Sequence, residues 1–125
     1  MIAAFASWHD SHEAARKAIE AGIRVVEHCT LETVSVLTRL PPPHRASGEL
    51  VRDFLRERFP RPFLRLGAKA YRRFLFELPD RGVAGGAVYD ALIAATAVEH
   101  GAELLSCDRR AAANYDRHGV RYALL

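Results

Sequence analysis

The chain has 125 residues, 50% hydrophobic and 26% charged, which is the composition of an ordinary globular domain. It has room for one compact domain, and no stretch reaches the roughly 18 uncharged apolar residues that a membrane span needs. Polar residues near the N-terminus exclude the apolar segment of a secretory signal. We therefore expect a cytoplasmic protein with a single domain over residues 1–125.

The basic residues are mostly arginine, which accounts for 16 of the 18, and the net charge is +3. The planar guanidinium group suits phosphate oxygens and acidic partners, but a solvated arginine surface explains the composition equally well. Cys29 and Cys107 are few and far apart, so we expect two reduced thiols, with neither a disulfide nor a zinc site.

Helices and short strands alternate along the predicted fold. Helices are expected from Ser11 to Gly22, then at residues 31–40 with Thr30 as the cap, 46–59, 68–78, 87–100 and 109–115. Strands are expected at residues 23–26, 63–66, 103–107 and 120–124. Such alternation is typical of a parallel sheet with helices on both faces, so the sequence predicts an α/β domain.

Three carboxylates stand in apolar surroundings. Glu32 lies in the first turn of the predicted helix 31–40, Asp90 lies in the most apolar helix, and Asp108 directly follows the next strand. Each also has a structural explanation: Glu32 can stabilise a helix N-terminus by about 0.3–1 kcal/mol, and the two aspartates can cap helices. Asp90 lies near the start of one helix and Asp108 at the end of the following strand. Both are therefore expected at the carboxyl ends of the parallel strands, where such folds bind ligands.

Carboxylates that share a crevice repel each other, and a bound cation relieves the repulsion. Ligation by oxygen alone suits Mg²⁺ or Mn²⁺, which can activate water and stabilise charge on a phosphoryl group. Ser106 is a candidate for positioning that water, and an ordinary strand serine is an equal alternative. The histidines lack the spacing of a zinc site.

Several segments resemble the acidic motifs of PIN domains. Residues 32–40 (ETVSVLTRL) resemble the second motif, in which an acid is followed by a serine and a helix that carries an arginine. Residues 89–97 (YDALIAATA), Gly101 and residues 104–110 (LLSCDRR) resemble the third and fourth. The likeness covers nearly the whole chain, and the block from Asp90 to Asp108 is its most specific part.

The resemblance implies a three-layer α/β/α domain with a short parallel sheet and a Mg²⁺- or Mn²⁺-dependent endoribonuclease activity. For small bacterial members of the VapC type it implies a toxin that is neutralised by a co-expressed VapB-type antitoxin and that usually forms a homodimer. Carried over to this sequence, it makes Glu32, Asp90 and Asp108 the catalytic, metal-binding carboxylates.

The N-terminus departs from the family pattern. Family members open with a hydrophobic strand that ends in an aspartate, whereas residues 1–6 resemble only the apolar run that follows it. The first central strand and the first acid are therefore expected upstream of Met1. Our hypothesis is that the cellular protein begins earlier, and the alternative is a truncated, catalytically impaired relative that retains binding to an antitoxin or another partner.

Arginine and aromatic residues are the candidates for contacts with the substrate and with a partner. Arg39, Arg109 and Arg110 are candidates for holding RNA phosphates near the acids, with surface solvation as an equal alternative for each. The helices at 46–59 and 68–78 and the segment between them carry more aromatic residues than a small domain easily buries, and a groove for an antitoxin helix is one use for the excess. These residues are Phe54, Phe59, Phe63, Tyr71, Phe74 and Phe76. A nucleotide-binding domain is the weaker reading, because no glycine-rich phosphate loop follows a strand.

Overall fold

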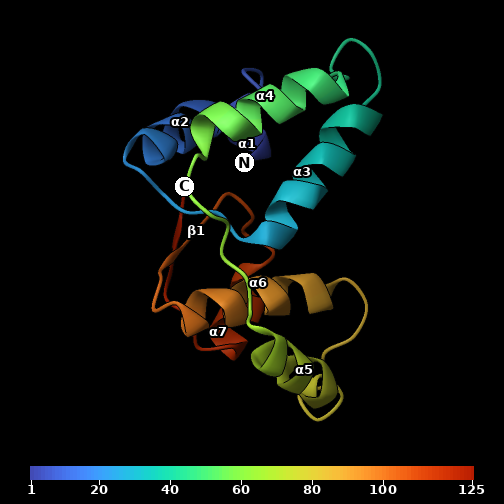
Figure 1. The fold of residues 1–125 in the computed structure, drawn as a ribbon, viewed down its shortest axis with the longest axis vertical. Helices are drawn as coiled ribbons and strands as arrows, with labels where there is room; N and C mark the ends of the chain where they lie inside the picture. The colour runs from blue at the N-terminus through green and yellow to red at the C-terminus, as the bar shows by residue number, and fades with distance from the viewer. The chain divides into compact units, whose positions relative to one another are not determined.

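The computed structural model of the protein describes all residues from Met1 to Leu125 and contains seven helices and two strands (Figure 1). In chain order they are α1 (Ile2–Phe5), α2 (His12–Glu20), α3 (Glu27–Arg39), α4 (Gly48–Arg58), α5 (Ala68–Glu77), α6 (Ala87–Glu99), β1 (Leu104–Ser106), α7 (Ala112–Arg117) and β2 (Tyr122–Leu124). The chain divides into two compact units, Met1–Phe63 and Leu64–Leu125. The first unit holds α1–α4, and the second holds α5–α7 and both strands.

The core of the first unit lies where α1, α3 and α4 meet. Leu37 of α3 and Val51 of α4 have no exposed surface, and side chains of α1 pack against them. The Phe54 ring of α4 stands nearly perpendicular to the Phe5 ring, with their centroids 5.2 Å apart. Leu50 of the same helix, in contrast, is exposed.

Helix α3 begins at Glu27, four residues before the predicted start, so the prediction that Thr30 caps it is wrong. The Thr30 hydroxyl instead donates to the Glu27 carbonyl oxygen at 2.7 Å, in the way threonine side chains bond to the preceding turn inside helices. The helix ends at Arg39, before the three prolines, as predicted. Glu32 therefore lies beyond the first turn, and the explanation of this residue by the helix dipole no longer applies.

The predicted strands at residues 23–26 and 63–66 are wrong. In each segment only one residue, Val26 in the first and Leu64 in the second, is an isolated bridge residue, and neither segment forms a strand. Arginine side chains bind the backbone in this part of the first unit: Arg24 Nη2 donates to the Pro62 carbonyl oxygen and Arg61 Nη2 to the Ile23 carbonyl oxygen, each at 3.2 Å. These carbonyl groups are satisfied without a regular ladder.

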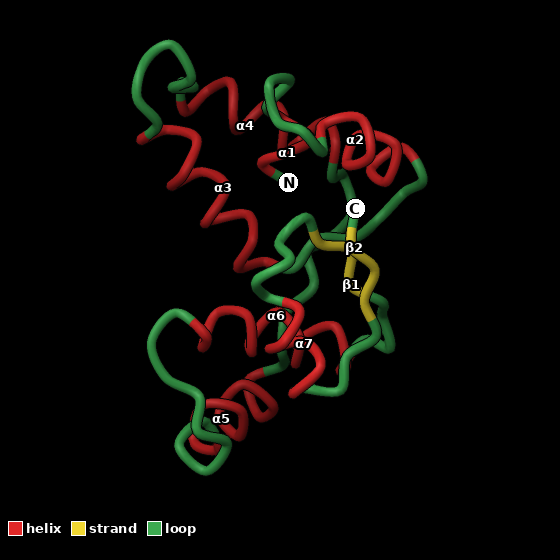
Figure 2. Tube along the Cα trace, turned by 180° about the vertical axis from the view of Figure 1, so that it is seen from behind, coloured by secondary structure: helices red, strands yellow, loops and turns green.

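The second unit contains a parallel pair of strands, joined by α7 (Figure 2). Leu104 pairs with Tyr122, and Ser106 pairs with Leu124. Both strands are three residues long, which is shorter than the predicted spans 103–107 and 120–124. The order strand, helix, parallel strand is the crossover unit on which α/β folds are built.

The core of the second unit joins α6 to α7. Ala94 and Ala97 of α6 pack with Tyr115 of α7 and with Val120, which precedes β2. Small side chains on α6 allow α7 to approach closely, which explains why this helix is rich in alanine. None of the helices of the chain has the length and apolar character that crossing a membrane requires. That residues 1–125 form a single domain stays a prediction.

Candidate functional site

Asp90 lies in the first turn of α6 and is half-buried. The residue at the start of this helix is Gly86, and no side chain caps the helix, so capping is not the role of Asp90. Its carboxylate oxygen Oδ2 accepts a hydrogen bond from the Asn114 side-chain amide Nδ2 at 2.9 Å. The other oxygen, Oδ1, takes no hydrogen bond and remains free to bind a ligand.

Asp108 is exposed and begins the turn between β1 and α7. Its backbone amide donates to the Ser106 hydroxyl oxygen at 3.0 Å, and its Oδ1 accepts from the Arg110 backbone amide at 2.8 Å. Asp108 therefore shapes the turn and does not cap α7, which starts after Ala111 without a side-chain cap. Its second carboxylate oxygen, Oδ2, takes no hydrogen bond.

Helix α7 makes contacts close to both aspartates. Asn114 binds Asp90, and the hydroxyl oxygen of the next residue, Tyr115, lies 3.5 Å from the Ser106 hydroxyl oxygen at the end of β1. Tyr115 is buried in the core of the second unit, which fixes this end of α7. Two adjacent residues of one helix thus contact α6 beside Asp90 and the strand end beside Asp108.

Glu32 lies in the first unit, on an exposed position of α3, and it forms no hydrogen bond or ion pair. Arg39 is also exposed, in the last turn of the same helix. Seven residues, about two helical turns, separate them, so Glu32 and Arg39 share one side of α3. Hydrogen bonds join the surroundings of Asp90 and Asp108 within the second unit.

The donor set at Asp90 and Asp108 fits a hard cation. Each carboxylate offers one free oxygen atom, no lysine or arginine forms an ion pair with either, and the hydrogen bond that each accepts comes from a neutral amide. Oxygen donors of this kind are the ligands that Mg²⁺ and Mn²⁺ prefer. The structure has no group of three or more His, Cys, Asp or Glu side chains that could hold a metal ion.

Asn114 and Tyr115 are the residues of this region that sequence reasoning missed. Asn114 is the only asparagine, and the chain has no glutamine, so a rare residue type was the one available signal. The hydrogen bond to Asp90 spans 24 residues of sequence, and no spacing rule connects the two positions. Arg109 and Arg110 lie where the sequence predicts them, exposed and next to Asp108.

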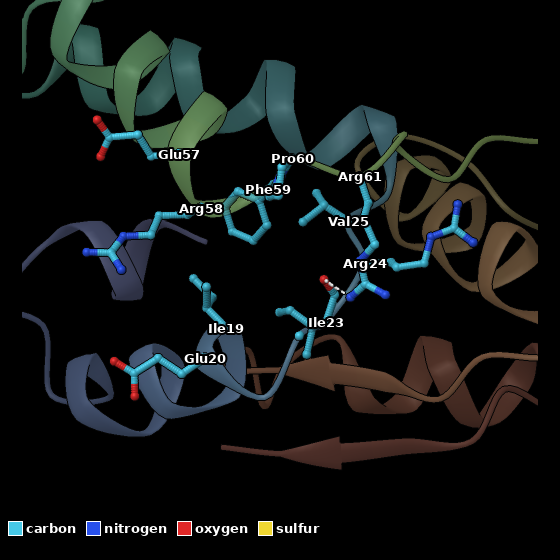
Figure 3. A pocket seen from close by; sticks show the side chains of 11 residues that line it. Ile19, Glu20, Ile23, Arg24, Val25, Glu57, Arg58, Phe59, Pro60 and Arg61 are labelled. Carbon is cyan, nitrogen blue, oxygen red and sulfur yellow. Dashed lines mark hydrogen bonds between the residues drawn. The ribbon is translucent and has the colours of Figure 1, made fainter.

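A pocket of about 280 Å³ lies in the first unit, and none of the residues that line it is a predicted site residue (Figure 3). The ends of α2 and α4 and the extended segment around Ile23 and Val25 line it. Its Arg61 donates to the Ile23 carbonyl oxygen, drawn as a dashed line, and its Arg24 donates to Pro62. Because two of its three arginines already bind the backbone, we assign this pocket no part in the candidate site.

The aromatic residues expected to form a partner groove divide between core and surface. Phe59 is buried, and Phe54 lies between the rings of Phe5 and Phe59. On α5, in contrast, no residue is buried, and Phe76 is 63% exposed. Tyr71 and Leu75 of the same helix are also exposed, so the accessible aromatic surface is that of α5.

Comparisons with known proteins identify the family. A model of the PIN domain matches residues 1–117. The chain is 43% identical over 125 residues to "Ribonuclease VapC40" from two strains of Mycobacterium tuberculosis, CDC 1551 / Oshkosh and H37Rv, covering the whole chain and 93% of each relative. It is 43% identical over 93 residues to "Ribonuclease VapC27" of strain H37Rv, covering 74% of the chain and 67% of that relative. These matches confirm the predicted α/β fold class and the resemblance, and the chain belongs to the PIN-domain family, among the VapC-type ribonucleases.

Proposed function

We propose that the protein is a divalent-metal-dependent endoribonuclease that hydrolyses phosphodiester bonds of RNA. The observation that carries the proposal is the arrangement around α7, where Asp90 and Asp108 each keep one carboxylate oxygen free and neither is paired with a cation. Carboxylates whose charge no cationic side chain compensates favour a bound cation. The ribonuclease names of the relatives support the same activity.

In this proposal Asp90, Asp108 and Glu32 hold Mg²⁺ or Mn²⁺. When bound, such a cation supplies charge stabilisation at the phosphoryl group and a more nucleophilic water. The protein's own groups orient the substrate: the exposed guanidinium groups of Arg109 and Arg110 beside Asp108 bind phosphates of the RNA backbone. Arg39, on the same side of α3 as Glu32, is assigned the same role, and the Ser106 hydroxyl is assigned to positioning water.

Cleavage of a single-stranded RNA tests the proposal. Asp90→Asn and Asp108→Asn keep the shape of each side chain and remove its charge, so we expect each to lower the cleavage rate by about 10² or more. Asp53→Asn is the matched control, because Asp53 is an exposed carboxylate that pairs with Arg52. The reaction should require Mg²⁺ or Mn²⁺ and stop with EDTA, and full activity of Asp90→Asn or activity in EDTA would contradict the proposal.

The second candidate function, a catalytically impaired binding module, has a distinct outcome. Such a protein would bind a partner but leave RNA intact with either metal. Measuring RNA cleavage and partner binding on the same preparation separates the two candidate functions.

We further propose a VapB-type antitoxin as partner, a homodimer as the assembly and the cytoplasm as the location, where RNA and antitoxin would both meet the protein. The apolar surface of α5 supports a protein partner, because Tyr71, Leu75 and Phe76 are exposed on a helix with no buried residue. We assign this surface to the antitoxin. Phe76→Ser should weaken co-purification with the product of the adjacent reading frame and leave thermal stability unchanged, whereas unaltered co-purification would contradict the assignment.

A further inference from the structure

The chain contains one carboxamide side chain, that of Asn114, and it binds Asp90. Asn114 is the third residue of α7, and its Nδ2 donates to Oδ2 of Asp90 at 2.9 Å. Both residues are half-buried, and α6 and α7 pack on each other through Ala94, Ala97 and Tyr115. A fixed helix pair therefore holds the amide and the carboxylate in place.

Several carboxylates elsewhere in the chain have charged partners. Arg16 pairs with Glu20, Arg81 with Glu77 and Arg52 with Asp53, and all three pairs are exposed. A protein with 16 arginines thus offers guanidinium groups to several of its carboxylates, but not to Asp90 or Asp108.

The neutral charge of the Asn114 amide affects how Asp90 can bind a cation. A guanidinium group would cancel the charge of Asp90 and compete with a metal ion for its oxygen atoms. An amide N–H fixes the position of the carboxylate and leaves its negative charge available. Because the amide already occupies one lone pair of Oδ2, the other oxygen atom, Oδ1, is the one that is fully open to a cation.

We propose that Asn114 is a positioning residue that fixes the Asp90 carboxylate, so that Oδ1 binds the divalent cation of the nuclease site. The inference rests on the proposed metal-dependent function and adds to it a residue outside the predicted carboxylates. Hydrogen-bond partners of metal ligands orient the ligand, and their loss typically lowers metal affinity by about 10–100-fold. Asn114 acts through Asp90 and does not itself touch the cation.

Metal binding without RNA gives a readout that is independent of activity. We expect Asn114→Leu, which is similar in size but has no donor, to weaken Mn²⁺ binding by about 10–100-fold in a titration followed by electron paramagnetic resonance. Asn114→Ser, which keeps a shorter donor, should lose less affinity. Asp116→Asn, an exposed position on the same helix, is the control for a general charge effect and should bind as the wild type does.

The single carboxamide also provides a direct spectroscopic signal. A ¹⁵N-labelled wild-type protein has one side-chain NH₂ pair from asparagine and glutamine together, so the pair of Asn114 needs no assignment by mutation. We expect saturating Mg²⁺ to shift this pair and Mn²⁺ to broaden it. Neither effect should occur in Asp90→Ala, which removes the carboxylate and adds no second carboxamide.

The outcomes separate this inference from the proposed function. If wild-type protein binds Mn²⁺ and Asp90→Ala does not, but folded Asn114→Leu binds as tightly as the wild type, Asn114 is only a structural link between helices and the inference is overturned. An NH₂ pair that ignores bound Mg²⁺ overturns it as well, even where Asn114→Leu fails to fold. If the wild type itself binds neither metal, the metal-dependent function fails and the inference fails with it.

Discussion

The hydroxyl oxygen of Ser106, the last residue of β1, accepts a hydrogen bond from the backbone amide of Asp108 at 3.0 Å. The side chain of the last residue of the strand therefore helps to fix the turn that carries the Asp108 carboxylate. The Arg110 backbone amide holds the carboxylate from the other side, at 2.8 Å from Oδ1. Two local bonds thus determine the direction of Asp108.

Ser106→Ala should loosen this turn. It removes an acceptor whose net contribution is about 0.5–1.5 kcal/mol, so we expect a loss of that size in the free energy of unfolding. If the turn also orients Asp108 for catalysis, RNA cleavage falls by roughly two- to tenfold as well. Ser35→Ala is the matched control, since Ser35 is exposed and forms no hydrogen bond. Equal behaviour of the two variants would contradict the role of Ser106.

Leu37→Ala should strongly destabilise the protein. Leu37 is completely buried between α3 and α4, and truncation of such a leucine costs about 2–5 kcal/mol because it leaves a cavity. Leu31→Ala makes the same change on the same helix, where Leu31 is 69% exposed, and its effect should stay within about 0.5 kcal/mol. Urea denaturation measures both, and similar losses would show that the packing of α3 described above is wrong.

Two serines precede helices, but only one caps its helix. The Ser47 hydroxyl accepts from the Leu50 backbone amide at 3.2 Å, whereas Ser11 forms no side-chain cap at the start of α2. Ser47→Ala should therefore reduce the free energy of unfolding by about 0.5–2 kcal/mol, and Ser11→Ala should have little effect. Chemical denaturation of both variants tests the difference, and the reverse order would disprove it.

His118, which follows α7, should make stability depend on pH. Burial of the imidazole, and then the charges of Arg81 and Arg117, lower the pKa of His118 from its ordinary value of 6.5. The unfolded chain then binds a proton more readily than the folded one, so the stabilisation is complete above pH 6.5 and is lost as pH falls through the lowered pKa. Between about pH 8 and about pH 5, unfolding free energy should fall less in His118→Gln than in the wild type. An identical pH dependence of the two proteins would contradict the shift.

Local signals in the sequence determined most helices and the two strands of the second unit. Gly22 stops α2 with φ at 87°, the prolines after Leu40 stop α3, and Gly101 follows α6 with φ at 60°. Each of these residues ends its helix through its own backbone conformation, so the helix ends can be predicted from the sequence alone. The same is true of Asp90 and Asp108, which stand out against the apolar residues beside them.

Tertiary structure alone decided the features that depend on distant residues. Strands at 23–26 and 63–66 looked plausible from their apolar side chains, but a strand exists only when a partner completes its ladder, and arginine side chains bind the backbone at Ile23 and Pro62 instead. The bond between Asn114 and Asp90 likewise depends on how α7 packs on α6. The sequence identified the carboxylates because their charge is a local property, whereas the partner that holds Asp90 became visible only when the chain brought together residues 24 positions apart.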